Sequence, residues 1–194
     1  MNQHSVLGMP DDRRWLFLDE VFLSNSISAA LGRSGTYKKD GPKNADVLLG
    51  SALRAELRKL AACYSGPEGT QPVGPEEHIQ KIAALVEAIK TSCAACLEDG
   101  SLRFGVAHKA LNVYLKFLWC EGRIPMPPHC PFHGEMIAKL KLPTGCERRW
   151  THGTEKDYRA WITAAEIEAG TEPLARWELC LWTRSAPVAL GQTA

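Results

Sequence analysis

The positions of the twelve prolines favour an architecture of helices joined by short loops for this 194-residue chain. Each proline falls between segments of apolar periodicity or at the start of one, where its missing N–H and fixed φ are tolerated. The segments themselves repeat apolar residues in steps of three and four, as one face of a helix requires. The sequence therefore predicts an all-α fold of about seven helices, packed orthogonally in a single domain over residues 1–194.

Capping and breaking residues set the expected limits of these helices. Between residues 32 and 43 we expect a basic, Gly-rich loop and the first candidate for mobility, and we expect flexible ends at 1–10 and 185–194. The expected helices run from Asp11 or Asp12 to about Leu31, after Asn44 through Tyr64, from Pro75 to Glu98, over 105–120, over 131–141, from Thr154 to near Gly170, and onward from Thr171.

Composition and cysteine usage indicate a cytoplasmic protein. A hydrophobic content of 45% is enough to bury a core, yet no run approaches the roughly 20 apolar residues of a membrane helix. The first residues, MNQHSVLGMPDDRR, lack the pattern of a signal peptide. Seven cysteines is an odd number, so we expect free and mostly buried thiols in a reducing compartment. Cys93 and Cys96 continue an apolar helical stripe, which favours packing over a redox or metal role.

Positive charge gathers in the middle of the chain. Residues 101–150 contain 8 Lys and Arg against 3 Asp and Glu, whereas both flanking segments are mildly acidic and the whole chain carries +1. Such an asymmetry marks either an anion-binding surface or ordinary solvated helix faces.

The helix expected at 105–120 carries the most informative polar residues. Gly105, Lys109, Asn112 and Lys116 follow one stripe beside a broad apolar face. One interpretation is an exposed polar face. The other is a lysine that contacts a phosphate or attacks a sugar carbon close to a helix start.

The stretch LRFGVAHKAL, residues 102–111, followed by Pro131-Phe132-His133, resembles the helix-hairpin-helix DNA glycosylase superfamily. The resemblance implies a hairpin glycine at Gly105, a nucleophilic lysine at Lys109, and His133 at the position of the catalytic aspartate. Ala107 stands where the second hairpin glycine is expected. The resemblance implies a protein that binds DNA. Because an imidazole replaces the carboxylate, two alternatives stay open: the lysine still forms a Schiff base with the sugar, or the protein binds DNA without cutting it.

The stretch CEGRIPMPPHCPFHGEM, residues 120–136, permits three interpretations. Its four prolines favour a semi-rigid connector, and the histidines near the next helix favour the lip of an active site. A zinc site built from Cys120, His129, Cys130 and His133 is the third, although their spacing matches no strong signature. We expect no metal and no cofactor.

Two functional hypotheses follow. The first is a DNA-binding helical protein with glycosylase or lyase chemistry at Lys109 and His133, acting on duplex DNA. Its nucleic-acid contacts would come from these residues: Gly105, Asn112, Lys116, Arg123, Arg148 and Arg149. Trp150, beside the last two arginines, either stacks on a base or closes the core. The second hypothesis is a non-catalytic all-α interaction protein, with a homo-oligomer as one form.

Overall fold

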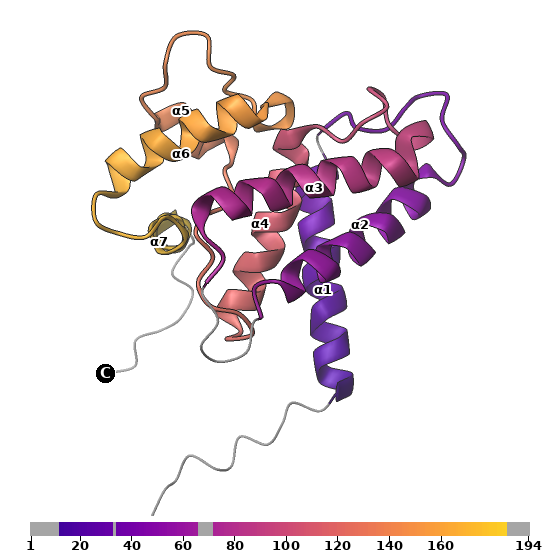
Figure 1. The fold of residues 1–194 in the computed structure, drawn as a ribbon, viewed down its shortest axis with the longest axis horizontal. Coiled ribbons are helices and arrows are strands. Elements are labelled where there is room, and N and C mark those ends of the chain that lie inside the picture. Colours follow the sequence, from indigo (N-terminus) through magenta and orange to yellow (C-terminus); the bar gives the residue numbers. More distant parts are fainter. Residues whose placement is uncertain (1–11, 33, 66–71, 186–194) are drawn as a thin grey trace, which may run out of the picture.

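The computed structural model describes residues 12–32, 34–65 and 72–185 and is all-α in this part of the chain (Figure 1). Seven α-helices confirm the expected fold class, and their packing is consistent with a single helical domain. The predicted flexible ends, apart from Ser185, lie outside the described residues. The helices are α1 (Asp12–Leu31), α2 (Ala45–Ala62), α3 (Pro75–Cys93), α4 (Phe104–Cys120), α5 (Gly134–Lys139), α6 (Glu155–Ala169) and α7 (Leu174–Ser185), with 3-10 turns η1 (Ala94–Cys96) and η2 (Trp150–His152).

Helix α4 lies at the centre of the fold. It packs against α1, α2, α3 and α6, and Figure 1 shows α2 and α3 crossing over α1 and α4. Its apolar residues repeat on more than one side of the axis, so that Val106, Ala110, Leu111 and Leu115 are all completely buried. A helix surrounded in this way leaves few positions where a polar side chain can reach solvent, and these positions define the site described below.

Local signals set several helix ends as expected. Pro75 occupies the first turn of α3, followed by two acidic residues that complement the helix dipole. Thr154 and Asp157 form a reciprocal capping box at the start of α6. Gly170 ends that helix with φ of 63°, a conformation that glycine adopts without steric cost. These limits agree with the sequence predictions.

Two helices are shorter than predicted, because residues expected in their last or first turn instead make contacts with distant parts of the chain. The predicted extension of α3 to Glu98 is wrong, since the chain leaves the helix at Cys93 and pairs with the 32–43 loop through an isolated bridge between Tyr37 and Leu97. The prediction of a helix over 131–141 is also wrong, because α5 begins only at Gly134. Phe132 is fully buried ahead of it in the extended connector.

The cysteines are free, as expected, but not mostly buried. Cys93, Cys96 and Cys130 are buried, whereas Cys63, Cys120 and Cys180 are exposed, the second of them because it is the last residue of α4. None of the helices in the described part of the chain combines the length and apolar character that crossing a membrane requires.

Candidate functional site

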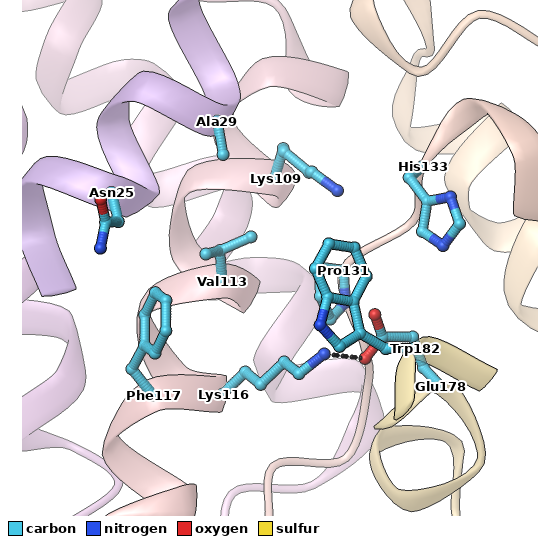
Figure 2. Close-up of a pocket in the computed structure, with 10 residues that line it drawn as sticks. All are labelled: Asn25, Ala29, Lys109, Val113, Lys116, Phe117, Pro131, His133, Glu178 and Trp182. Atoms are coloured by element: carbon cyan, nitrogen blue, oxygen red, sulfur yellow. Dashed lines mark hydrogen bonds and ion pairs between the residues drawn. The ribbon is translucent and has the colours of Figure 1, made fainter. Parts of the chain in front are cut away.

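A pocket of about 270 Å³ lies where α1, α4, α7 and the connector before α5 meet (Figure 2). Four ionisable side chains line it: Lys109 and Lys116 from α4, His133 from the connector, and Glu178 from α7. The pocket thus brings together the two residues expected to be catalytic, although they lie 24 positions apart in the chain. Six of its ten lining residues belong to the basic stretch 101–150.

Lys109 is held in this pocket as an amine with a weakened affinity for protons. Its Nζ donates a hydrogen bond to the carbonyl oxygen of Phe132 at 3.1 Å and lies 5.8 Å from the centroid of the Trp150 ring. Burial lowers the pKa of Lys109 to about 8, against the opposing effect of the nearby Glu178 carboxylate. A substantial neutral fraction therefore exists near neutral pH, as a nucleophilic lysine requires.

Glu178 is the site residue that sequence reasoning missed. Its side chain is only 2% exposed, and its Oε2 accepts a hydrogen bond from Lys116 Nζ at 2.6 Å. Trp182, one turn later on α7, places its ring 5.3 Å from the same Nζ. The one signal in the sequence was a glutamate among the apolar residues of α7, because a carboxylate that is buried by such neighbours needs a cationic partner.

His133 faces the pocket from the residue that precedes α5 (Figure 2). Its ring centroid lies 6.4 Å from that of Trp182. Partial burial, and next the positive charge of Lys109, hold the pKa of His133 below its ordinary value. A neutral imidazole of this kind can accept or donate a proton during a reaction at Lys109.

Gly105 and Asn112 do not reach the pocket. The Gly105 N–H donates to the carbonyl oxygen of Gly153 at 2.9 Å, and a Cβ on Gly105 would lie 1.7 Å from the Trp150 carbonyl oxygen. The structure therefore gives this glycine a packing reason, and its N–H is already engaged. Asn112 is buried and donates from Nδ2 to the Tyr158 hydroxyl at 3.1 Å. Of the stripe expected on α4, Lys109 and Lys116 line the pocket, whereas Gly105 and Asn112 lie in the core.

The three arginines proposed for nucleic-acid binding lie outside the pocket. Arg123 stacks on Trp15, with 4.0 Å between its guanidinium carbon and the ring centroid, in a separate hollow between α1, α2 and α4. Arg149 pairs with Glu147 at 3.0 Å, which lowers the pKa of that carboxyl to about 2. Arg148 is exposed beside it. Their nucleic-acid roles remain predictions.

A chain of buried polar groups crosses the core beside the pocket and was not anticipated. Tyr64 and His78 share a hydrogen bond of 2.6 Å, and the His78 ring meets that of His129 edge-on at 4.8 Å. Since Asn112 donates to the Tyr158 oxygen, the Tyr158 proton is available to His129 Nδ1 at 3.2 Å. Burial lowers the pKa of His129 to about 4.

His108 is buried in the same region, and neither ring nitrogen makes a hydrogen bond of ordinary geometry within the described residues, although the Gly105 backbone is close enough to act on the pKa of the ring. Its ring lies against three aromatic side chains, Phe132, Tyr158 and Trp161. Complete burial lowers the pKa of His108 to about 3, so the ring is neutral at physiological pH.

The connector between α4 and α5 contributes to the pocket through Pro131 and His133. The other candidate zinc ligands point elsewhere, since Cys120 is exposed and His129 bonds to Tyr158. Burial raises the pKa of the Cys130 thiol well above its ordinary value. Across the described ranges, no group of three or more His, Cys, Asp or Glu side chains is arranged to hold a metal ion.

The pocket combines a buried amine with a neutral imidazole, a buried carboxylate and an aromatic wall. An amine of this kind adds to an aldehyde or ketone carbon to form a Schiff base, and the neighbouring acid and base groups can move the protons that the reaction requires. Comparison of the chain with protein-family models, with curated proteins and with solved structures found no match.

Proposed function

We propose that this protein binds DNA and uses Lys109 to form a Schiff base with the aldehyde sugar of an abasic nucleotide, as a glycosylase- or lyase-like enzyme. The observation that carries the proposal is the Lys109 amine, lowered to a pKa of about 8 inside a walled pocket that it shares with His133. About a quarter of such an amine is neutral at pH 7.5, against roughly one part in a thousand for an ordinary lysine.

The size of the pocket limits the substrate that can reach this amine. A volume of about 270 Å³ lies just below the usual range for ligand sites and accommodates one sugar or base unit, not a length of duplex. A nucleotide in a duplex would therefore turn out of the helix to reach Lys109, at an unstacking cost that is smallest at an abasic or damaged position. Trp182 is 58% exposed at the pocket edge, and we expect its exposed part to contact a neighbouring base.

Charge around the pocket supports an anionic substrate. The segment 101–150 carries 8 Lys and Arg against 3 Asp and Glu, and Lys139 on α5 lies close enough to His133 to affect the pKa of that ring. Glu178 offsets the charge of Lys116 within the pocket, so that Lys109 supplies the remaining positive charge when protonated. Phosphates on either side of a flipped nucleotide would meet Lys109 and Lys139, and such contacts would make the binding salt-dependent.

Borohydride trapping on an abasic DNA duplex tests the proposal. We expect a covalent protein–DNA adduct with the wild-type chain, its loss in Lys109→Ala, and its retention in the matched control Lys81→Ala. Lys81 is also a half-buried lysine, but it pairs with Glu77 on α3, outside the pocket. Absence of the adduct with the folded wild-type protein would reject the proposal, and absence of salt-dependent DNA binding would reject its binding part as well.

A second candidate is a non-catalytic interaction protein, favoured by two adjacent exposed apolar residues on α1. Leu16 is 60% exposed and Phe17 is 68% exposed, an unusual pairing for the surface of a monomer. This candidate predicts a stable oligomer by light scattering, returned to monomer by Phe17→Glu, and no affinity for DNA at low salt.

We place the protein in the cytoplasm on chemical grounds. All seven thiols are free, and three of them are exposed, which suits a compartment that keeps cysteines reduced. Localisation of a tagged full-length chain by microscopy or fractionation tests this placement, and recovery from a secreted fraction would contradict it.

A further inference from the structure

The carboxylate of Glu178 lines the pocket, although the sequence motif gave no reason to expect it there. The resemblance implies His133 where a catalytic aspartate would be, which leaves the linear motif without a carboxylate. The fold supplies one from a distant segment, because α7 brings Glu178 to the same pocket as Lys109, from 69 residues farther along the chain. Figure 2 shows the Lys116–Glu178 ion pair beside the Trp182 ring, with Lys109 and His133 lining the same space.

The surroundings of Glu178 pair its carboxylate with a cation and fix its direction. Its side chain is 2% exposed, a costly position for a charge that has no partner. Lys116 compensates through the 2.6 Å hydrogen bond to Oε2, and its ammonium group is itself held against the Trp182 ring. The effect of the Glu178 carboxylate on Lys109 places both groups in one electrostatic environment. Such a carboxylate is poised to accept a proton from a substrate joined to Lys109.

We propose that Glu178 is the catalytic base that removes a proton from a sugar bound covalently to Lys109, so that the strand is cut by β-elimination. This step rests on the function proposed above. The neutral amine adds to the aldehyde carbon C1′, water leaves with one added proton, and an iminium forms. Glu178 then takes a proton from C2′, a C2′–C3′ double bond forms, and the C3′–O bond breaks, with its electron pair leaving on the phosphate. Hydrolysis of the iminium returns the Lys109 amine and releases an unsaturated aldehyde.

Two readouts on one abasic duplex separate this step from Schiff-base formation. Borohydride trapping measures the iminium, and strand cleavage without borohydride measures the elimination. In Glu178→Gln we expect the trapped adduct within about threefold of wild type, and cleavage slower by roughly a hundredfold, the typical loss on removal of a general base. Cleavage by Glu178→Gln at the wild-type rate would overturn the inference, while an intact adduct would leave the proposed function standing.

A paired variant guards against misfolding, because Glu178→Gln leaves Lys116 with no charged partner. Lys116→Met combined with Glu178→Gln removes both charges and keeps the volume, a change that buried ion pairs commonly tolerate. This double variant should form the adduct and cleave as slowly as Glu178→Gln alone. Cleavage by the double variant at the wild-type rate would overturn the role of Glu178. Absence of any adduct with the folded wild-type chain would instead reject the proposed function itself.

Discussion

Lys109 owes its proposed reactivity to the side chains packed around it. Burial weakens its hold on a proton, and the Phe132 carbonyl fixes the position of Nζ. Neither effect is visible in the sequence, where Lys109 is one of several lysines on an amphipathic pattern.

The titration of Lys109 is the first prediction at this scale. The rate of acetylation of Lys109 with a trace of labelled acetic anhydride, followed by peptide mass spectrometry from pH 6 to 11, should show a midpoint near pH 8. Lys81, whose pKa is raised by its bond to Glu77, provides the internal reference and should titrate higher. A Lys109 midpoint above that of Lys81 would contradict the description of the pocket.

His108 and Tyr158 allow a comparison between a buried polar side chain without hydrogen bonds of ordinary geometry and one that is hydrogen-bonded. The His108 ring makes no hydrogen bond of ordinary geometry within the described residues, so His108→Leu should leave the free energy of unfolding unchanged or raise it by about 1 kcal/mol. Tyr158→Phe breaks the bonds with Asn112 and His129 and should lower the free energy of unfolding by about 1–3 kcal/mol. Urea denaturation at pH 7.5 measures both, and a large loss in His108→Leu would show that the imidazole has a partner.

At the scale of elements, Gly105 shows how α4 meets η2. Alanine is the better helix former by about 1 kcal/mol, yet its Cβ would lie 1.7 Å from the Trp150 carbonyl oxygen. Gly105→Ala should therefore lower the free energy of unfolding by about 2–4 kcal/mol, because backbone must move. Gly134→Ala, at the start of α5, meets nothing within 4 Å and is the control expected to be neutral. Equal effects of the two changes would refute the close packing of α4 on η2.

Helices were predictable where local periodicity and capping decide the structure. The stripe of Leu49, Leu53, Leu57 and Leu60 predicted the buried face of α2, and all four are buried. The short α5 was not predictable, because burial of Phe132 against distant aromatic residues overrides the helix-start signal of a proline.

The candidate site was predictable only in part. Lys109 and His133 could be named from a short resemblance, since both belong to the motif itself. Glu178 could not, because its place in the pocket depends on how packing against α6 positions α7 beside α4, and spacing along the chain does not encode such long-range packing. Asn112 follows Lys109 by three positions yet points into the core, since α4 is buried on most of its circumference.

At the scale of the whole molecule, three buried histidines make the fold sensitive to acid. Burial lowers the pKa of His78, of His108 to about 3 and of His129 to about 4, so the unfolded chain binds protons that the folded chain does not. Stability is therefore complete above the ordinary histidine pKa of about 6.5 and falls progressively as the pH drops from there toward 4.

Urea denaturation between pH 7.5 and pH 4.5 should show a steady fall in the midpoint over this range. In His108→Leu the slope should be smaller, because one of the three groups no longer takes up a proton on unfolding. A midpoint that does not change between pH 7.5 and 4.5 would mean that these histidines are charged or exposed in the folded protein.

The central claim is that one amine, that of Lys109, reacts. The most direct measurement is the identity of the residue that carries the borohydride-reduced adduct, obtained by digestion of the trapped complex and tandem mass spectrometry. We predict a single modified position at Lys109. An adduct on any other amine, or none with folded wild-type protein and an abasic duplex, would contradict the account.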